Sequence, residues 1–193
     1  MRKFLLALSC SMLLVSAGAS VAVRAADNYQ VDPVHTAVTF KISHLGLSWT
    51  YGRFNEVSGH FTTDSADPAR SSFELSMRPE SVDTGNLKRD EHLRGPDFFN
   101  VKQFRVLSFT SKSVRPIQGG FEVTGDFTLH GSTRSITFPL LGGRTAEFPP
   151  GVKRTGYSTE FKMKRSDFGM DKMIGAVGDE IDVAISFEGV KGR

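Results

Sequence analysis

Cysteine is nearly absent from this chain of 193 residues, in which Cys10 is the only one. Cys10 lies in an N-terminal stretch with the features of a cleavable export signal: basic residues at the start, an apolar run from Phe4 to Val15, and small residues up to Ala25. The apolar run is shorter than the ~20 residues that span a bilayer. We expect residues 1–25 to be a signal peptide, so the mature chain would contain neither a disulfide nor cysteine-based chemistry.

An excess of one charge is also lacking once this leader is set aside. The full chain has 24 Lys and Arg against 21 Asp and Glu, a net charge of +3. Arg2, Lys3 and Arg24 account for that difference, so the mature chain is neutral. Neutrality argues against nucleic acid as a partner, because nucleic-acid binding needs a basic face. An exported chain without disulfides is typical of a bacterial periplasm, where we expect this protein to be located.

Motifs of common catalytic sites are missing as well. The chain has no H-E-x-x-H, no G-x-S-x-G, no Gly-Lys dipeptide of a P-loop and no G-x-G-x-x-G after a strand. We therefore expect no enzyme, no cofactor and no metal. Two alternatives stay open on the histidines: an enzyme that acts on a lipid head group through His44 or His92, and a metal- or haem-binding barrel that uses His44, His92 or His130.

Phenylalanine is what the chain has in quantity, with 16 Phe against 3 Tyr and 1 Trp. Because Phe has no polar handle, this excess indicates a large dry interior. Apolar and polar residues alternate with the period of β-strands over several segments. The predicted strands are Val38–His44, 53–63, 73–77, 106–114, Phe121–Leu129, Ile136–Leu140, Tyr157–Arg165 and Ile181–Phe187.

These eight strands predict one all-β domain over residues 26–193, an antiparallel, lipocalin-like barrel. Turn residues separate the strands at 65–68, 118–120 and 142–143. One segment does not alternate: residues 86–94 are good helix formers, and Gly95-Pro96 ends them. We expect Asp90 and Arg94 to form an ion pair on the surface of this helix. We also expect the apolar loop after the helix to close one end of the barrel.

An eight-stranded barrel is just wide enough to be filled by side chains or to hold one small ligand. We expect the inward faces here to surround a space, and a ligand in it to be apolar. Burying about fifteen methylenes at ~0.8 kcal/mol each contributes ~12 kcal/mol against an association cost of ~4–15 kcal/mol, which favours a long lipid. The predicted ligand-binding side chains are Phe40, Ile42, His44, Phe73, Leu93, Phe98, Phe99, Phe109, Phe127, Phe138, Phe161, Met163, Ile185 and Phe187.

Polar side chains in or near the inward rows are candidates for the rim or for structural ion pairs. His44 ends the first inward row, where it would meet a polar head group or be satisfied by backbone at the rim. Arg165 shares the inward parity of Phe161, and a buried guanidinium needs partners, for which Asp90 and Asp167 are candidates. The full set of these rim or ion-pair candidates is Arg53, Arg89, Asp90, His92, Arg165 and Asp167.

A series of motifs along the chain resembles one known family. The motifs are Tyr29-Gln30-Val31-Asp32-Pro33-Val34-His35-Thr36, His44-Leu45-Gly46, Gly52-Arg53-Phe54, Arg89-Asp90-Glu91-His92-Leu93-Arg94 with Asp97-Phe98-Phe99, Gly125-Asp126-Phe127-Thr128-Leu129-His130-Gly131 and Arg165-Ser166-Asp167-Phe168-Gly169-Met170. Their order is similar to that of the YceI-like family, with residues 144–153 as a variable loop. The resemblance implies a lipocalin-like barrel, usually periplasmic, that binds polyisoprenoids such as isoprenoid quinones. We expect the protein to bind an apolar lipid and to contact a membrane transiently during loading. Whether it forms a homodimer is an open question at this point.

Overall fold

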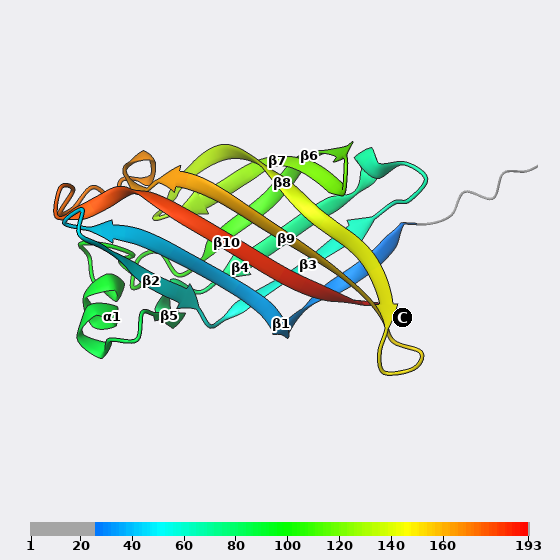
Figure 1. Ribbon diagram of the computed structural model, residues 1–193, viewed down its shortest axis with the longest axis horizontal. Helices are drawn as coiled ribbons and strands as arrows, with labels where there is room; N and C mark the ends of the chain where they lie inside the picture. Colours follow the sequence, from blue (N-terminus) through cyan, green and yellow to red (C-terminus); the bar gives the residue numbers. More distant parts are fainter. Residues whose placement is uncertain (1–25, 193) are drawn as a thin grey trace, which may run out of the picture.

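The computed structural model describes residues 26–192, so the predicted signal peptide lies outside the described residues. Ten strands and one α-helix, α1 (Leu87–Arg94), make up an elongated barrel (Figure 1). Short 3-10 helices, η1 (Pro68–Arg70), η2 (Pro79–Ser81) and η3 (Arg165–Phe168), connect some of them. The strands are β1 (Asp27–His44), β2 (Ser48–Phe54), β3 (Val57–Thr63), β4 (Ser72–Met77), β5 (Val82–Asp83), β6 (Leu107–Ile117), β7 (Gly120–Leu129), β8 (Ser132–Glu147), β9 (Lys153–Lys164) and β10 (Val177–Lys191).

One antiparallel sheet closes on itself through the pairing of β1 with β10, which runs from Tyr29 opposite Lys191 to His44 opposite Val177. Eight strands form the closed barrel: β1, β3, β4, β6, β7, β8, β9 and β10. The long strand β1 has two partners on its other side, because its start pairs with β3 and its end pairs with β2. The sheet continues through β2 to β5, next to α1, so the predicted eight-stranded barrel is confirmed with two extra strands.

The inward parity predicted from alternation is also confirmed. On β7, Val123, Phe127 and Leu129 are buried. The alternate residues point outward, where Thr124 and Thr128 bond threonine hydroxyls of β8 at 2.8 Å. The helix is confirmed too, because the side chain of Asn86 caps α1 by accepting a hydrogen bond from the amide of Arg89.

Three local expectations were wrong. Residues 53–63 form parts of two strands, because β2 ends at Phe54 and β3 begins at Val57. Between them, the amide of Asn55 donates a hydrogen bond to the carbonyl of Ser81. Gly142 and Gly143 make a bulge inside β8 and no turn; both have positive φ, which glycine adopts without strain. The predicted loop 144–153 shrinks to residues 148–152, because β8 continues to Glu147.

A bulge in β1 between Asp32 and Ala37 is tied to the start of β9. The Asp32 carboxylate accepts hydrogen bonds from Arg154 Nη1 at 2.6 Å, His35 Nδ1 at 2.8 Å and the amide of Val34 at 3.0 Å. The bond from Arg154 is the largest reason that the pKa of Asp32 lies well below its usual range. No helix among the described residues is long and apolar enough to cross a bilayer.

Placing a charge on each face of β7 tests the parity. Phe127→Asp removes a buried ring and buries a carboxylate, and each change costs about 3–5 kcal/mol, so we expect loss of folded protein. Thr128→Asp loses only an outward hydroxyl contact and should cost less than about 1.5 kcal/mol. Urea denaturation measures the free energy of unfolding of both variants. A larger loss for Thr128→Asp would contradict the parity.

The Asp32 contacts predict a defined acid sensitivity. Because the folded-state pKa of Asp32 lies below its unfolded value of ~3.9, its stabilising contribution is complete above that value and is lost as the pH falls through the folded-state pKa. We expect Asp32→Asn to lower the free energy of unfolding at pH 7, and the difference from the unsubstituted protein to shrink below about pH 4. Urea titrations from pH 7 to pH 3 measure this difference, and one that stays constant across that range would contradict the assignment.

Candidate functional site

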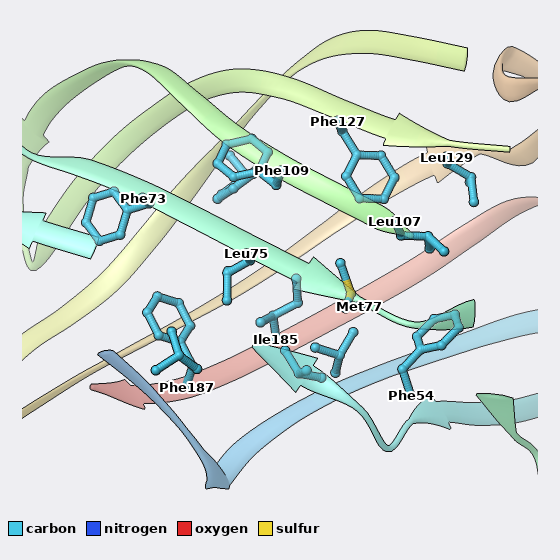
Figure 2. Packing of buried hydrophobic residues seen from close by; sticks show 14 of the residues in the cluster. Phe54, Phe73, Leu75, Met77, Leu107, Phe109, Phe127, Leu129, Ile185 and Phe187 are labelled. Atoms are coloured by element: carbon cyan, nitrogen blue, oxygen red, sulfur yellow. The ribbon is translucent and has the colours of Figure 1, made fainter. Parts of the chain in front are cut away.

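The barrel interior holds two small cavities lined almost entirely by apolar side chains. The inner cavity, about 20 Å³, lies between Phe73, Phe109, Val123, Phe138 and Phe187. The helix-end cavity, about 50 Å³, is bounded by residues nearer α1, such as Val38, Phe54 and Phe99. Figure 2 shows buried side chains from several strands packed inside the barrel, with Phe73 and Phe187 at one side of the view and Phe54 and Leu129 at the other. Four side chains wall both cavities: Met77, Phe127, Phe161 and Ile185.

The expectation that the strands surround an open space is not met in this structure. Pockets that hold small molecules measure about 300–1,000 Å³, whereas these cavities have room for little more than a water molecule each. The physical reason is the phenylalanine content itself, because large rings project inward from neighbouring strands of a barrel that is narrow to begin with. Any ligand in the interior must therefore push side chains apart.

Ten of the fourteen predicted ligand-binding residues do come together around these cavities. They are Phe40, Phe73, Phe99, Phe109, Phe127, Phe138, Phe161, Met163, Ile185 and Phe187. The other four lie elsewhere. Ile42 is half-buried on β1, Leu93 is half-buried on α1, and Phe98 is buried beside η3. His44 is exposed at the end of β1, so its expected inward position was wrong: the strand runs past the interior before it reaches His44.

A plug of six aromatic rings closes the end of the barrel away from α1. Neighbouring ring centroids in the plug lie 5.0–6.0 Å apart, in stacked, tilted and edge-on pairs. Burial of the Tyr157 ring raises the pKa of its hydroxyl to about 12. A polar groove outside the plug includes Tyr29, Phe121 and Tyr157. The plug consists of Tyr29, Phe61, Phe73, Phe121, Tyr157 and Phe187.

The other end is held by Arg165, which is only 1% exposed. Its guanidinium donates hydrogen bonds to the carbonyls of Met170 at 2.6 Å, Lys172 and Gly178 at 2.8 Å, and Val177 at 3.1 Å. Two of these carbonyls lie in the loop after η3 and two at the start of β10, so the bonds tie that loop to the end of the barrel. Burial lowers the pKa of Arg165 from its ordinary value.

The expected ion pair of Arg165 with Asp90 or Asp167 was therefore wrong, because backbone carbonyls take the donors that a carboxylate would have taken. Asp167 is exposed on η3. Asp90 is buried, and its carboxylate accepts hydrogen bonds from the amide (2.9 Å) and hydroxyl (2.5 Å) of Thr84. Asp90 does not pair with Arg94, which donates to the carbonyls of residues 80 and 82. Asp90 therefore anchors α1 to Thr84, in the segment that follows β5.

The remaining polar candidates lie outside the interior. Arg53 is exposed on β2 opposite Asp83 of β5, and Arg89 is exposed and donates to Thr84. His92 is exposed, with Nε2 at 3.2 Å from an oxygen of Asp97. Across residues 26–192, no three His, Cys, Asp or Glu side chains lie close enough together to hold a metal ion.

Thr159 on β9 is a buried polar residue of the interior that the predicted ligand-binding set did not include, as it did not include apolar wall residues such as Met77 and Ile136. Thr159 is 6% exposed and lines the inner cavity, and its hydroxyl has no hydrogen-bond partner in the part of the chain that the structure describes. A buried hydroxyl without a partner is uncommon, because leaving it unpaired costs about 1–3 kcal/mol. The signal in the sequence was one threonine in an otherwise apolar inward row between Tyr157 and Phe161.

Comparison with known proteins agrees with this architecture. The model of the family described as YceI-like domain matches residues 29–189. "Protein YceI" of Escherichia coli O17:K52:H18 is 38% identical over 193 residues, with 99% of each chain covered. The crystal structure of Burkholderia cenocepacia BcnA superposes with a TM-score of 0.75 at 22% identity, covering 82% of this chain and 98% of that one.

A second solved structure is described as a polyisoprenoid binding domain from Saccharophagus degradans implicated in plant cell wall breakdown. It superposes with a TM-score of 0.64 at 17% identity and covers 85% of this chain and 98% of that chain. At this level of identity, both superpositions show a shared fold.

The bonds of Arg165 predict a large stability loss for a conservative change. In Arg165→Lys, one ammonium group cannot reach all four carbonyls, so several buried acceptors lose their donor, and we expect a cost of about 3–5 kcal/mol. Arg134→Lys is the control, because Arg134 is exposed and donates only to the carbonyl of its neighbour Thr133. Guanidinium unfolding compares the two variants, and an equal, small effect of both would show that the Arg165 contacts contribute little.

Proposed function

This chain belongs to the YceI-like family, and we propose that it is a periplasmic binding protein that carries one long apolar lipid, of the polyisoprenoid class, in its barrel. The observation that carries the proposal is the apolar interior, because no charged side chain of residues 26–192 lines either cavity. The S. degradans neighbour, which is described as binding polyisoprenoids on the same fold, supports the choice of ligand class.

The packing of the interior decides how a lipid tail would fit. A tail must replace the contacts that the inward side chains now make with one another. The four side chains that separate the two cavities are suited to this exchange: Met77 is flexible, and Phe161 is only partly buried. Movement of these walls would join both cavities into one slot along the barrel.

The length of the tail follows from the energetics of burial. Each methylene that leaves water contributes ~0.8 kcal/mol, and association alone costs ~4–15 kcal/mol. Displacing packed side chains adds to that cost, so a short apolar molecule would gain too little to bind tightly. Fifteen carbons contribute about 12 kcal/mol, which lies within the range of the association cost, so we expect a tail of at least this length; prenyl chains of three or more units satisfy this condition.

The proposal places the chain in the periplasm, reached through the signal peptide, and includes contact with a membrane during loading. The two alternatives find less support. His44 and His92 line neither cavity, so they are poorly placed to act on a lipid held inside. No observation favours a metal or haem site over lipid binding.

Filling the inner cavity tests the proposal. Ile136→Phe places a ring into that cavity from a position that is only partly buried, so we expect the fold to survive and the lipid bound per protein to fall at least tenfold. Ser135→Phe adds the same ring on the outward face and should leave lipid content unchanged.

The measurement is mass spectrometry of organic extracts from protein purified from the periplasm of its native host. Circular dichroism of both variants checks the fold. If the unsubstituted protein yields no stoichiometric lipid, the proposal is wrong.

A further inference from the structure

We propose that the lipid enters through the side of the barrel, between β8 and β9, and that its head group is neutral and is bound there by the hydroxyl of Thr159. This inference rests on the proposed function and adds the entry route, the head-group site and the head-group chemistry. Four independent features of the described chain point to the same place.

The first feature is a seam in the barrel wall. Strands β8 and β9 pair from Leu141 opposite Ser158 to Glu147 opposite Lys153. No ladder pair joins residues 132–140 of β8 to residues 159–164 of β9; within residues 26–192 these segments pair only with β7 and β10. Pro139, which has no amide proton to donate to a ladder, lies on the β8 side of this seam. The seam can therefore widen without breaking a ladder of hydrogen bonds.

The second feature is that both ends of the barrel are closed. Six packed rings, the aromatic plug described above, fill the end away from α1. The four carbonyl bonds of Arg165 hold the loop across the other end, with Phe98 against the guanidinium. Opening either end would therefore break several ring contacts of the plug or the four hydrogen bonds of Arg165.

The third feature is the thinness of the wall at the seam. Thr159 and Ile185 line the inner cavity and also a groove of about 370 Å³ on the outside of the barrel, over β1, β8, β9 and β10. Phe161 lines both interior cavities and a neighbouring outer groove. Its ring stacks on Phe138 of β8 at 5.1 Å, so this ring pair bridges the seam. Rotation of one partly buried ring would connect the outside with the interior.

The fourth feature is the unpartnered hydroxyl of Thr159, which is buried on the inner side of this wall, at the inner cavity. A buried water needs two to four polar partners, yet among residues 26–192 Thr159 is the only polar residue around the inner cavity. A water there would be held by one hydrogen bond. An oxygen of a lipid whose tail already fills the interior needs no other partner, because the tail supplies the affinity.

The chemistry of the outer groove selects the head group. Its walls carry small and uncharged residues such as Ala37, Ala184 and Ser186, and its one charged residue is the acidic Glu160. No Lys or Arg lines it, so a phosphate would meet repulsion without compensation. Lys162, in the neighbouring groove, is paired with Glu180 at 2.6 Å and Asp182 at 3.4 Å. A hydroxyl or carbonyl fits this groove, and a diphosphate does not.

The test measures the binding of three probes by equilibrium dialysis: geranylgeraniol, geranylgeranyl diphosphate and squalene, a hydrocarbon without oxygen. Thr159→Val removes the hydroxyl at nearly constant volume. We expect the affinity for geranylgeraniol to fall about 3–10-fold, the affinity for squalene to stay within twofold, and Thr159→Ser to retain wild-type binding. Thr159→Val should also melt at the same or a higher temperature, because it removes an unpaired buried group. Unchanged geranylgeraniol binding in Thr159→Val would overturn the head-group site.

A charge reversal tests the head-group chemistry separately. Glu160→Lys should raise the affinity for the diphosphate about tenfold at low salt, while Glu91→Lys on α1, an equal charge change outside the groove, should not. Tighter binding of the diphosphate than of geranylgeraniol by the unsubstituted protein would overturn the neutral head group. If the unsubstituted protein binds none of the three probes, the proposed function itself fails. If it binds them and all variants bind equally, the head-group site at Thr159 fails while the proposed function stands.

Discussion

Closure of the sheet by β1 and β10 is the constraint on which the rest of the structure depends. It closes one sheet into a barrel of eight strands, and every inward side chain must fit into the interior of that barrel. Because so many of these side chains are phenylalanine, the interior is dry and nearly full. The same closure leaves the ends and the incompletely paired β8–β9 seam as the places where the barrel could admit a molecule.

Much of this architecture could be predicted from the sequence, because alternation reports directly which residues share a face. The inward rows through Phe127, Phe161 and Ile185 could be predicted from alternation alone. The helix could be predicted from its helix-forming residues. His44 shows the limit: alternation gives the face of a strand, but it does not say where along the strand the interior ends. Gly142 and Gly143 show another, because a pair of glycines is compatible with a turn and with a bulge.

The polar contacts were harder to predict because they depend on loops whose paths the sequence does not specify. A buried Arg165 indicated a need for partners, but the partners are carbonyls of the following loop and of the start of β10, up to thirteen residues away in the chain. Asp90 reaches Thr84 and not the helix partner that spacing suggested. The full interior is a packing outcome of the same kind: composition predicts a dry core, while the size of the space left inside depends on how the rings interlock.

The central claim is that a lipid tail displaces the packed side chains and occupies the interior of the barrel. Methyl NMR of protein with ¹³C-labelled methionines, saturated with geranylgeraniol, tests it most directly, because Met77 and Met163 line the cavities and Met173 is exposed. The account predicts intermolecular NOEs from the prenyl tail to the methyl groups of Met77 and Met163, and none to Met173. NOEs confined to Met173, with the interior methyl groups unperturbed, would contradict it.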